Sequence, residues 1–263
     1  MTEPAQKSGP PRCNVLGVGV HAVNIPSALQ AVADAVRDGR KGYVCVTGVH
    51  GVMEAQKSAE MRAILNSAFL NVPDGMPMVW VGRAQGFGDM RRVYGPEFML
   101  AVCEASVKQG WRHFLYGGKP GVAESLKAFL ENRFPGIQVA GTCTPPFRPL
   151  NPEEEAALAE QVRQARPDCF WVGLSTPKQE AFMSKFLSRL DAKVMFGVGA
   201  AFDVWTGGIK DAPAWMKKSG LQWAHRLVQE PRRLWRRYAV IVPSFLGLIL
   251  LQALGLKKYA LDR

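Results

Sequence analysis

Asp74 is the acidic residue of this sequence with the clearest setting for chemistry. It stands between Pro73 and Gly75, directly after the short apolar run Phe69–Val72. A carboxylate held on a rigid turn at the end of a strand could act as a general base. Pro-Asp-Gly is also a common turn sequence, so these residues could serve only to turn the chain. Spacing alone leaves both interpretations open.

Two further polar residues follow an apolar run in the same way. Thr47 ends the run Tyr43–Thr47, and His50 stands three residues later. A hydroxyl or an imidazole at this point could contact a ligand. Thr47 could equally cap the helix expected after it, and His50 could be an ordinary surface residue.

Gln179 and Glu180 follow the turn sequence Ser175–Lys178. They could begin a capped helix with an acid in its first turn. They could also recognise a hydroxyl of a sugar or a base through an amide and a carboxylate. Asp203 lies in the apolar run Ala200–Trp205, where an acid needs a partner, so ligand contact and a buried hydrogen bond compete.

A phosphate site is indicated where the apolar run Val194–Gly197 leads into a glycine-rich turn containing Gly199. Such a turn lets a ligand approach backbone N–H groups closely. Guanidinium groups, which bind phosphate oxygens through paired hydrogen bonds, follow in the same part of the chain. They belong to Arg226, Arg232, Arg233, Arg236 and Arg237.

These arginines are interleaved with aromatic residues, namely Trp223, Trp235 and Tyr238. The combination suits a membrane–water interface and also single-stranded nucleic acid. A solvated helix face is the plainer interpretation, because arginines on helices are common.

Several familiar motifs are missing. The sequence contains no dinucleotide-binding G-x-G-x-x-G, no Walker A motif and no G-x-S-x-G. The four histidines have no metal-ligand spacing, and no two aspartates stand two apart. We therefore expect neither a bound metal nor a cofactor, and positive side chains would have to neutralise any diphosphate.

The net charge of +11 is concentrated at one end of the chain. Residues 207–263 hold 11 Lys and Arg against 3 acids, so this segment carries +8 of the total. A local basic surface could meet nucleic acid, anionic lipid or a phosphorylated ligand.

An uncharged run of 18 residues, Ala239–Leu256, follows the arginines. As a helix it would be about 27 Å long, which only just reaches the hydrocarbon thickness of a bilayer. Pro243 and Gln252 interrupt it. The pattern favours a helix that lies in the interface or packs on the protein over a buried core helix or a true span.

The remaining chain alternates apolar runs with amphipathic segments, which predicts an α/β fold with a Rossmann-like parallel sheet flanked by helices. A first strand is expected at Val15–Val20. Later strands are expected at Tyr43–Thr47, Phe69–Val72, Trp111–Tyr116, Ile137–Thr142, Cys169–Gly173 and Lys193–Gly197. The expected organisation is a disordered tail over residues 1–12, a catalytic core over 13–207 and a helical, basic, membrane-associating appendage over 208–263.

Several short motifs occur together in a fixed order. In the C-terminal half they are Gly197-Val198-Gly199-Ala200-x-Phe202-Asp203, Ala212-Pro213, Gly220-Leu221-x-Trp223, Arg226-Leu227 and Glu230-Pro231-Arg232-Arg233-x-x-Arg236-Arg237-Tyr238. Upstream are Pro73-Asp74-Gly75, Gly95-Pro96 and Val172-Gly173-Leu174-x-x-Pro177-x-Gln179-Glu180. Over about residues 13 to 240 these motifs resemble the WecG/TagA/CpsF family, glycosyltransferase family 26.

The resemblance implies an inverting, metal-independent transferase. Such an enzyme would move a sugar from a UDP-sugar to an undecaprenyl-diphosphate-linked sugar, in exopolysaccharide or cell-envelope polysaccharide synthesis. It would work in the cytoplasm, peripherally on the inner face of the cell membrane. The expected partners are the UDP-sugar donor, the lipid-diphosphate-linked acceptor and the membrane surface, with no nucleic acid.

The resemblance also implies roles for single residues. Asp74 would be the general base that deprotonates the acceptor hydroxyl, and Thr47 would contact substrate beside it. Gln179, Glu180 and Asp203 match motif positions that line the pocket. The arginines of the appendage would close over the diphosphate and meet the membrane; they are Arg226, Arg233, Arg236 and Arg237.

One departure from the family pattern concerns the sugar donor. The family often has Thr-x-Asn-x-Glu after its second strand, whereas Thr47-Gly48-Val49-His50-Gly51 stands here. This departure favours glucose, as in xanthan- or acetan-type β-1,4-glucosyltransferases, over the usual N-acetylmannosamine-type donor.

A different class of protein is the alternative, namely a non-enzymatic basic protein that binds membrane or nucleic acid. The uncharged run after the arginines has no use on a nucleic acid, which weighs against that part of the alternative. A dinucleotide-dependent oxidoreductase is disfavoured by the missing glycine fingerprint. Homo-oligomerisation is possible, since exposed apolar surface must be covered.

Overall fold

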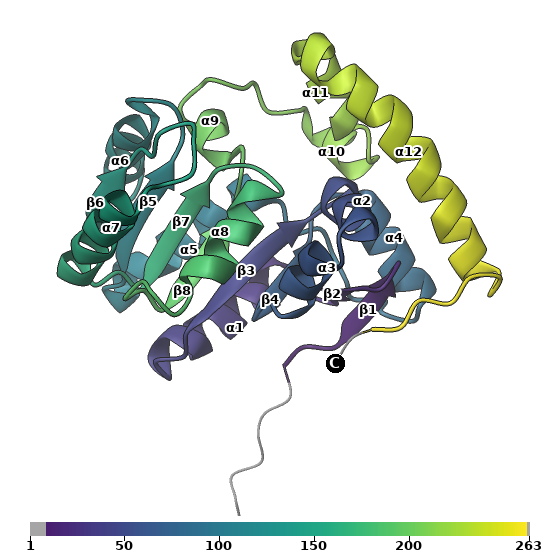
Figure 1. Cartoon of the computed structure of the whole chain (residues 1–263), viewed down its shortest axis with the longest axis horizontal. Coiled ribbons are helices and arrows are strands. Elements are labelled where there is room, and N and C mark those ends of the chain that lie inside the picture. The colour runs from purple at the N-terminus through teal and green to yellow at the C-terminus, as the bar shows by residue number, and fades with distance from the viewer. Residues whose placement is uncertain (1–8, 262–263) are drawn as a thin grey trace, which may run out of the picture.

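A computed structural model describes residues 9–261 of the chain. At its centre is a parallel sheet of six strands in the order β4-β3-β8-β7-β5-β6 (Figure 1). The strands are β3 (Gly42–Thr47), β4 (Leu70–Pro73), β5 (Arg112–Gly117), β6 (Gln138–Cys143), β7 (Cys169–Gly173) and β8 (Val194–Gly197). Every neighbouring pair is parallel. The predicted α/β fold with a parallel sheet flanked by helices is confirmed.

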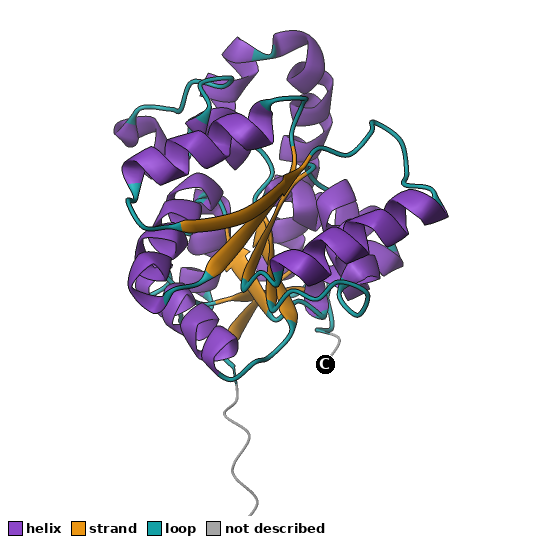
Figure 2. Cartoon of the chain, turned by 90° about the vertical axis from the view of Figure 1, so that its left-hand side faces the viewer, coloured by secondary structure: helices purple, strands orange, loops and turns teal. Residues whose placement is uncertain are grey.

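Helices cover both faces of this sheet, as Figure 2 shows. One layer contains α1 (Ile25–Arg37), α5 (Gly95–Gln109), α6 (Val122–Arg133) and the short α9 (Ala201–Trp205). The other contains α2 (Val49–Lys57), α3 (Ala59–Asn66), α7 (Pro152–Ala165) and α8 (Lys178–Phe186). Side chains alternate between the two layers, because successive residues of a strand point to opposite faces. Val44 and Trp171 belong to the first core, whereas Cys45 and Phe170 belong to the second.

The predicted strand Val15–Val20 is wrong, because this segment turns back on itself. It belongs to an antiparallel hairpin of β1 (Arg12–Val15) and β2 (Val18–His21), outside the six-stranded sheet. The turn is made by Leu16 and Gly17, with φ angles of 54° and 82°. Two consecutive residues with positive φ are typical of the tight turns that join hairpin strands.

The C-terminal part of the chain is helical. It contains α10 (Ala214–Lys218), α11 (Gln222–Gln229) and α12 (Pro231–Ala253), while α4 (Met76–Ala84) follows β4. α12 runs through both the arginine-rich segment and the uncharged run, and it continues past Pro243. A proline inside a helix costs stability, and here Ile241 and Phe245 on either side of it are buried against the core.

The far end of α12 is tied to the hairpin at the other end of the chain. The side chain of Gln252 accepts from the backbone N–H of Leu16 at 2.9 Å and donates to the carbonyl of Asn14 at 2.8 Å. Asn14 in turn donates to the carbonyl of Tyr259 at 2.7 Å. α12 is therefore fixed at several points along its length and runs along one side of the molecule (Figure 1). Residues 1–8 of the predicted tail lie outside the described residues.

Candidate active site

A cavity of about 1270 Å³ lies at the carboxyl ends of the sheet strands. Its floor comes from the segments that follow β3, β4, β7 and β8, four neighbouring strands of the sheet. Its opposite wall comes from α11 and α12. Open α/β sheets bind their ligands at this edge, so the cavity is the candidate active site.

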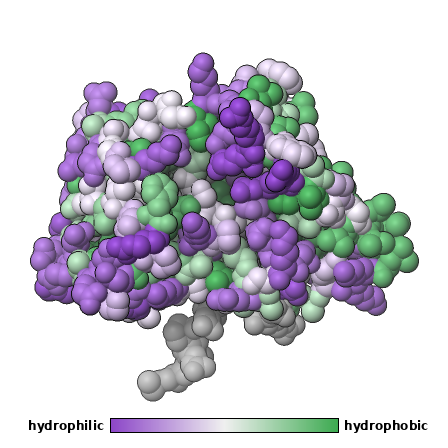
Figure 3. Space-filling model, turned by 45° about the horizontal axis from the view of Figure 1, so that its top comes forward, coloured by the Kyte–Doolittle hydropathy of each residue, from purple (hydrophilic) through white to green (hydrophobic). Residues whose placement is uncertain are grey.

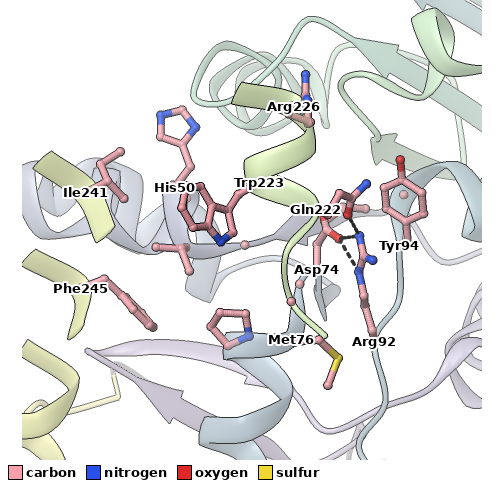
Figure 4. Close-up of a pocket in the computed structure, with 18 of the residues that line it drawn as sticks. His50, Asp74, Met76, Arg92, Tyr94, Gln222, Trp223, Arg226, Ile241 and Phe245 are labelled. Atoms are coloured by element: carbon pink, nitrogen blue, oxygen red, sulfur yellow. Dashed lines mark hydrogen bonds and ion pairs between the residues drawn. The ribbon is translucent and has the colours of Figure 1, made fainter. Parts of the chain in front are cut away.

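Asp74 lies in this cavity, directly after β4. Its backbone N–H donates to the carbonyl of Thr47 at 2.9 Å, which fixes the turn against the neighbouring strand. The side chain of Arg92 donates to Oδ1 of Asp74 from Nε at 3.3 Å and from Nη2 at 3.2 Å (Figure 4). Among the described residues nothing donates to Oδ2, so this oxygen is available to a ligand.

Arg92 is itself held in place. Its guanidinium lies 4.3 Å from the centre of the Tyr94 ring and donates to the side-chain oxygen of Gln222. Only 12% of the Arg92 side chain is exposed, against 32% for Asp74. A buried, stacked guanidinium orients the carboxylate that it binds. The sequence interpretation missed Arg92, which stands in a basic loop 18 residues after Asp74.

Burial raises the pKa of Asp74 above its usual range, and Arg92 and Arg226 oppose the rise through their positive charges. The exposed part of this side chain faces the cavity and the rest is surrounded by protein. A carboxylate with a raised pKa is a stronger base than an exposed one. The site therefore provides an oriented carboxylate with one free oxygen.

A second polar group joins α10 to the wall of the cavity. The Tyr94 hydroxyl donates to Asp211 at 3.0 Å. Lys217 donates to Asp211 at 3.0 Å and to Glu97 at 2.8 Å. None of these four residues was predicted from the sequence, because their pairing links segments more than a hundred residues apart. The group fixes the appendage on the core beside Asp74.

Three of the four predicted site arginines line the cavity. They are Arg226 from α11 and Arg233 and Arg237 from α12. Arg226 and Arg233 share the carboxylate of Glu230, at 3.4 Å and 2.5 Å, while Arg237 forms no ion pair with any described residue. Positive charge therefore exceeds negative charge on this wall, which suits an anionic ligand.

Arg236, the fourth predicted arginine, does not line the main cavity. It borders a smaller hollow beside His50 and Arg237, and its guanidinium lies 5.5 Å from the centre of the Trp235 ring. Its predicted contact with substrate stays a prediction.

His50 lines the main cavity at the start of α2. Burial, with a smaller contribution from the charge of Arg237, lowers the pKa of His50 to about 4. The imidazole is therefore neutral near pH 7, and its 3.6 Å contact with Glu54 is not an ion pair under these conditions. A neutral His50 could donate or accept a hydrogen bond to a ligand.

Gln179 lines the cavity, whereas Glu180 and Thr47 lie behind its wall. Gln179 donates to Oε1 of Glu180 at 3.1 Å, and the Thr176 hydroxyl donates to the same oxygen at 2.8 Å. Burial raises the pKa of Glu180. One oxygen each of Thr47, Gln179 and Glu180 is buried without a hydrogen-bond partner among the described residues. Such groups are costly unless something else satisfies them.

The glycines after β8 make room for Gln179. A Cβ atom added to Gly197 would lie 3.2 Å from Cδ of Gln179, and one added to Gly199 would lie 3.5 Å from its Oε1. Gly199 also has φ +53°, which L side chains rarely adopt. The predicted turn thus brings its backbone close to the Gln179 amide, and both line the cavity.

Asp203 is half-buried in α9 and does not line the cavity, although Ala200 and Val204 on either side of it do. Its backbone carbonyl accepts from the N–H of Ile209 at 3.0 Å. Substrate contact by the Asp203 side chain therefore stays a prediction.

Two helix N-termini also open onto the cavity. α2 begins after Gly48 and α4 after Gly75, and neither has a side-chain cap. The first residues of both helices line the cavity. Uncapped N–H groups favour negative charge, which adds to the effect of the arginines. Within residues 9–261, no three His, Cys, Asp or Glu side chains gather as metal ligands would.

The cavity continues from this polar part into an apolar part. α4 contributes Trp80, Val81 and Ala84 to its lining, and α12 contributes apolar side chains that include Ile241 and Phe245. In Figure 4 these two residues lie on the opposite side of the view from Arg92 and Tyr94. A ligand with both a charged and an apolar portion would fit such a cavity.

Exposed large apolar side chains gather over the C-terminal helices. All of them except Trp80 and Phe147 lie between Trp215 and Leu256. Figure 3 shows hydrophobic surface on the right-hand side of the molecule, where α12 lies in Figure 1. α12 is the helix within the described part of the chain that is long and apolar enough to cross a membrane, by length and composition alone.

A parallel α/β sheet with an oriented carboxylate and a cationic cavity at its carboxyl edge is typical of enzymes that act on phosphorylated substrates. A profile of the "Glycosyl transferase WecG/TagA/CpsF family" matches residues 13–259. The chain belongs to this family. The resemblance to this family is therefore confirmed. The prediction of a glycosyltransferase is also confirmed, and the alternative of a non-enzymatic protein is wrong.

Two similar proteins from Bacillus are named N-acetylglucosaminyldiphosphoundecaprenol N-acetyl-beta-D-mannosaminyltransferase. The protein of Bacillus spizizenii is 29% identical over 215 residues, covering 81% of this chain and 80% of its own. That of Bacillus subtilis is 30% identical over 183 residues, covering 70% and 69%. Both names describe hexosyl transfer to a lipid-diphosphate-linked sugar, in agreement with the predicted enzyme type.

Proposed function

We propose that this protein transfers a hexose from a UDP-sugar to an undecaprenyl-diphosphate-linked sugar, in the synthesis of exopolysaccharide or cell-envelope polysaccharide. The observation that carries the proposal is the Asp74–Arg92 pair in a basic cavity that continues into an apolar part. The names of the two Bacillus relatives support a lipid-diphosphate-linked acceptor.

The reaction would be a single displacement with inversion at the anomeric carbon. Oδ2 of Asp74 takes the proton of the acceptor hydroxyl as its oxygen bonds to the anomeric carbon of the donor sugar. The bond from that carbon to the phosphate oxygen breaks, and UDP leaves with the electron pair. Arg226, whose positive charge also acts on Asp74, and the uncapped N-termini of α2 and α4 offset the charge that develops on the UDP diphosphate, which supports a reaction without metal. Arg233 and Arg237 are then left for the diphosphate of the acceptor lipid.

The residues that select the donor sugar would lie in the first turn of α2. Val49 and Gly51 stand where the family pattern often has Asn and Glu, and both line the cavity. Neither side chain can hydrogen-bond to an N-acetyl group, which favours glucose as the donor. The names of the relatives favour N-acetylmannosamine, so this sugar is the second candidate.

The enzyme would act on the inner face of the cell membrane without spanning it. One face of α12 is packed on the core, with Leu234, Ile241 and Phe245 buried, while its other face exposes apolar side chains. Trp215, Trp223 and Trp235 are exposed near the arginines, as at a membrane–water interface.

The test is a UDP-release assay on the purified full chain, with a panel of UDP-sugars and a lipid-diphosphate-linked N-acetylglucosamine acceptor. We expect release that requires the acceptor, persists in EDTA and is fastest with UDP-glucose. Fastest release with UDP-N-acetylmannosamine would overturn only the donor assignment. No release with any donor would contradict the proposed function, and loss of activity in EDTA would contradict the metal-free reaction.

A further inference from the structure

The apolar part of the cavity is formed along two helices. On α12 it is lined by two rows of side chains in which successive residues are four positions apart, and by Gln252, whose amide is already bonded to the backbone of Leu16 and Asn14. One row is Arg233, Arg237, Ile241, Phe245, Ile249 and Ala253, and the other is Leu234, Tyr238, Val242, Leu246 and Leu250. Residues four apart share a face of a helix, so this face of α12 changes from cationic to apolar along its length.

The facing wall is α4, which contributes Trp80, Val81 and Ala84. We call the space between these three residues and the stretch Ile241–Ala253 of α12 the apolar groove. Its floor is closed, since Ile241 and Phe245 are 6% and 4% exposed, while Trp80 at 51% and Leu250 at 57% form an open rim. On α12 the groove extends over about 18 Å, at 1.5 Å per residue.

The groove suits a ligand without polar groups. Both of its walls are helices, whose backbone N–H and C=O groups in the middle of each helix are already bonded internally. A peptide strand lying there would find few partners for its own backbone groups. A hydrocarbon chain has no such groups, and each CH₂ that leaves water contributes about 0.8 kcal/mol.

We propose that the apolar groove holds the first isoprene units of the acceptor lipid, next to its diphosphate. This inference rests on the proposed function. Arg233 and Arg237 precede Ile241 on the same face of α12, so a diphosphate at the arginines leads its chain into the groove. The sugar on the other side of the diphosphate then extends toward Asp74. The enzyme would thereby select an acceptor by the distance between its lipid chain and the hydroxyl that reacts at Asp74.

The first test fills the groove. Ala84 is exposed on α4 and lines the groove, so Ala84→Trp occupies the space with little expected cost to folding. Transfer is measured in detergent micelles with two acceptors that carry the same diphosphate-linked sugar, one with a long polyprenyl chain and one with a short alkyl chain. We expect Ala84→Trp to raise KM for the long-chain acceptor about tenfold more than KM for the short-chain one.

The matched control is Ala157→Trp, at an exposed position on α7 that does not line the cavity. It should leave both KM values unchanged. An equal effect of Ala84→Trp on the two acceptors, or no effect, would overturn the groove assignment while leaving the proposed function intact. Failure of the unaltered enzyme to use either acceptor would instead count against the proposed function.

A binding measurement tests the groove without relying on activity. A polyprenyl diphosphate with a photoreactive group in its first isoprene units is cross-linked to the full chain, and the labelled peptides are mapped. We expect labels within residues 76–84 and 241–253. Labels confined to Trp235 and Leu254, exposed residues that do not line the cavity, would mean that the chain stays in the bilayer and the groove is not its site.

Discussion

At the scale of single residues, burial and a neighbouring charge shift the pKa of Asp74 in opposite directions. Burial raises its pKa, and the charge of Arg92 lowers it. Both bonds from Arg92 go to Oδ1, which leaves Oδ2 pointing to no protein donor among residues 9–261. Arg92 thus fixes the orientation of the Asp74 carboxylate, with Oδ2 free, and limits the rise in its pKa. We infer that it is a positioning residue for the proposed base.

Replacing Arg92 by Met should lower kcat by about 10²-fold, because a misplaced catalytic group loses its alignment with the substrate. It should also raise the pKa of Asp74, since the opposing charge is gone. Asp74 acts when deprotonated, so the rising limb of the kcat–pH profile should move to higher pH. Arg92→Lys keeps the charge and should restore the position of this limb. An unmoved limb in Arg92→Met would exclude the positioning role.

The sequence showed part of this arrangement. Asp74 could be singled out because a Pro-Asp-Gly turn after an apolar run places an acid at the ligand edge of a sheet. Arg92 could not, because nothing in a loop 18 residues later indicates which carboxylate it will meet. The burial of Thr47 and Glu180 behind the cavity wall could not be predicted either, since the position of a residue along a strand or a helix does not say how deeply its side chain is buried.

At the scale of elements, the arginines converge from two helices. Arg226, Arg233 and Arg237 stand seven and four residues apart, a spacing that would place them on one face of an unbroken helix. The chain instead breaks at Glu230 between α11 and α12, and the three side chains meet in one cavity from both sides of that break. The hairpin turn at Leu16 and Gly17 was missed because a short apolar run gives no sign of reversal.

Replacing Arg233 and Arg237 together by Gln should lower kcat/KM for transfer by at least about 10²-fold. Hydrogen bonds to charged groups contribute about 1.5–3 kcal/mol each, so two lost contacts to a diphosphate are enough for this effect. Arg232→Gln is the matched control, because Arg232 is exposed on the same helix and does not line the cavity. Equal losses in both variants, measured in detergent, would show that general charge rather than this site is responsible.

At the scale of the whole molecule, one side of the protein carries most of the exposed large apolar side chains of the described residues. The exposed apolar side chains follow the same helices that form the cavity wall. Binding at a membrane would therefore bring the cavity to the surface in which a lipid-linked acceptor lies. The predicted membrane association and the predicted site depend on the same appendage.

Replacing Leu251 and Leu254 by Glu should weaken binding to anionic vesicles at least about tenfold, because each removes a leucine side chain from the proposed contact and adds a negative charge. Both residues are exposed and neither lines the cavity, so Tm should change little. Vesicle flotation and thermal unfolding measure the two effects. Unaltered protein that does not float and sediments as an oligomer would contradict membrane binding and favour self-association through this face.

The most direct test of the account replaces Asp74 by Asn, which keeps the shape of the side chain and removes the base. Transfer to the lipid-linked acceptor is measured under single-turnover conditions, and UDP-sugar binding is measured by calorimetry on the same preparation. The account predicts a loss of transfer of about 10³-fold with donor binding within a few-fold of the unaltered enzyme. Near-normal turnover in Asp74→Asn would contradict it.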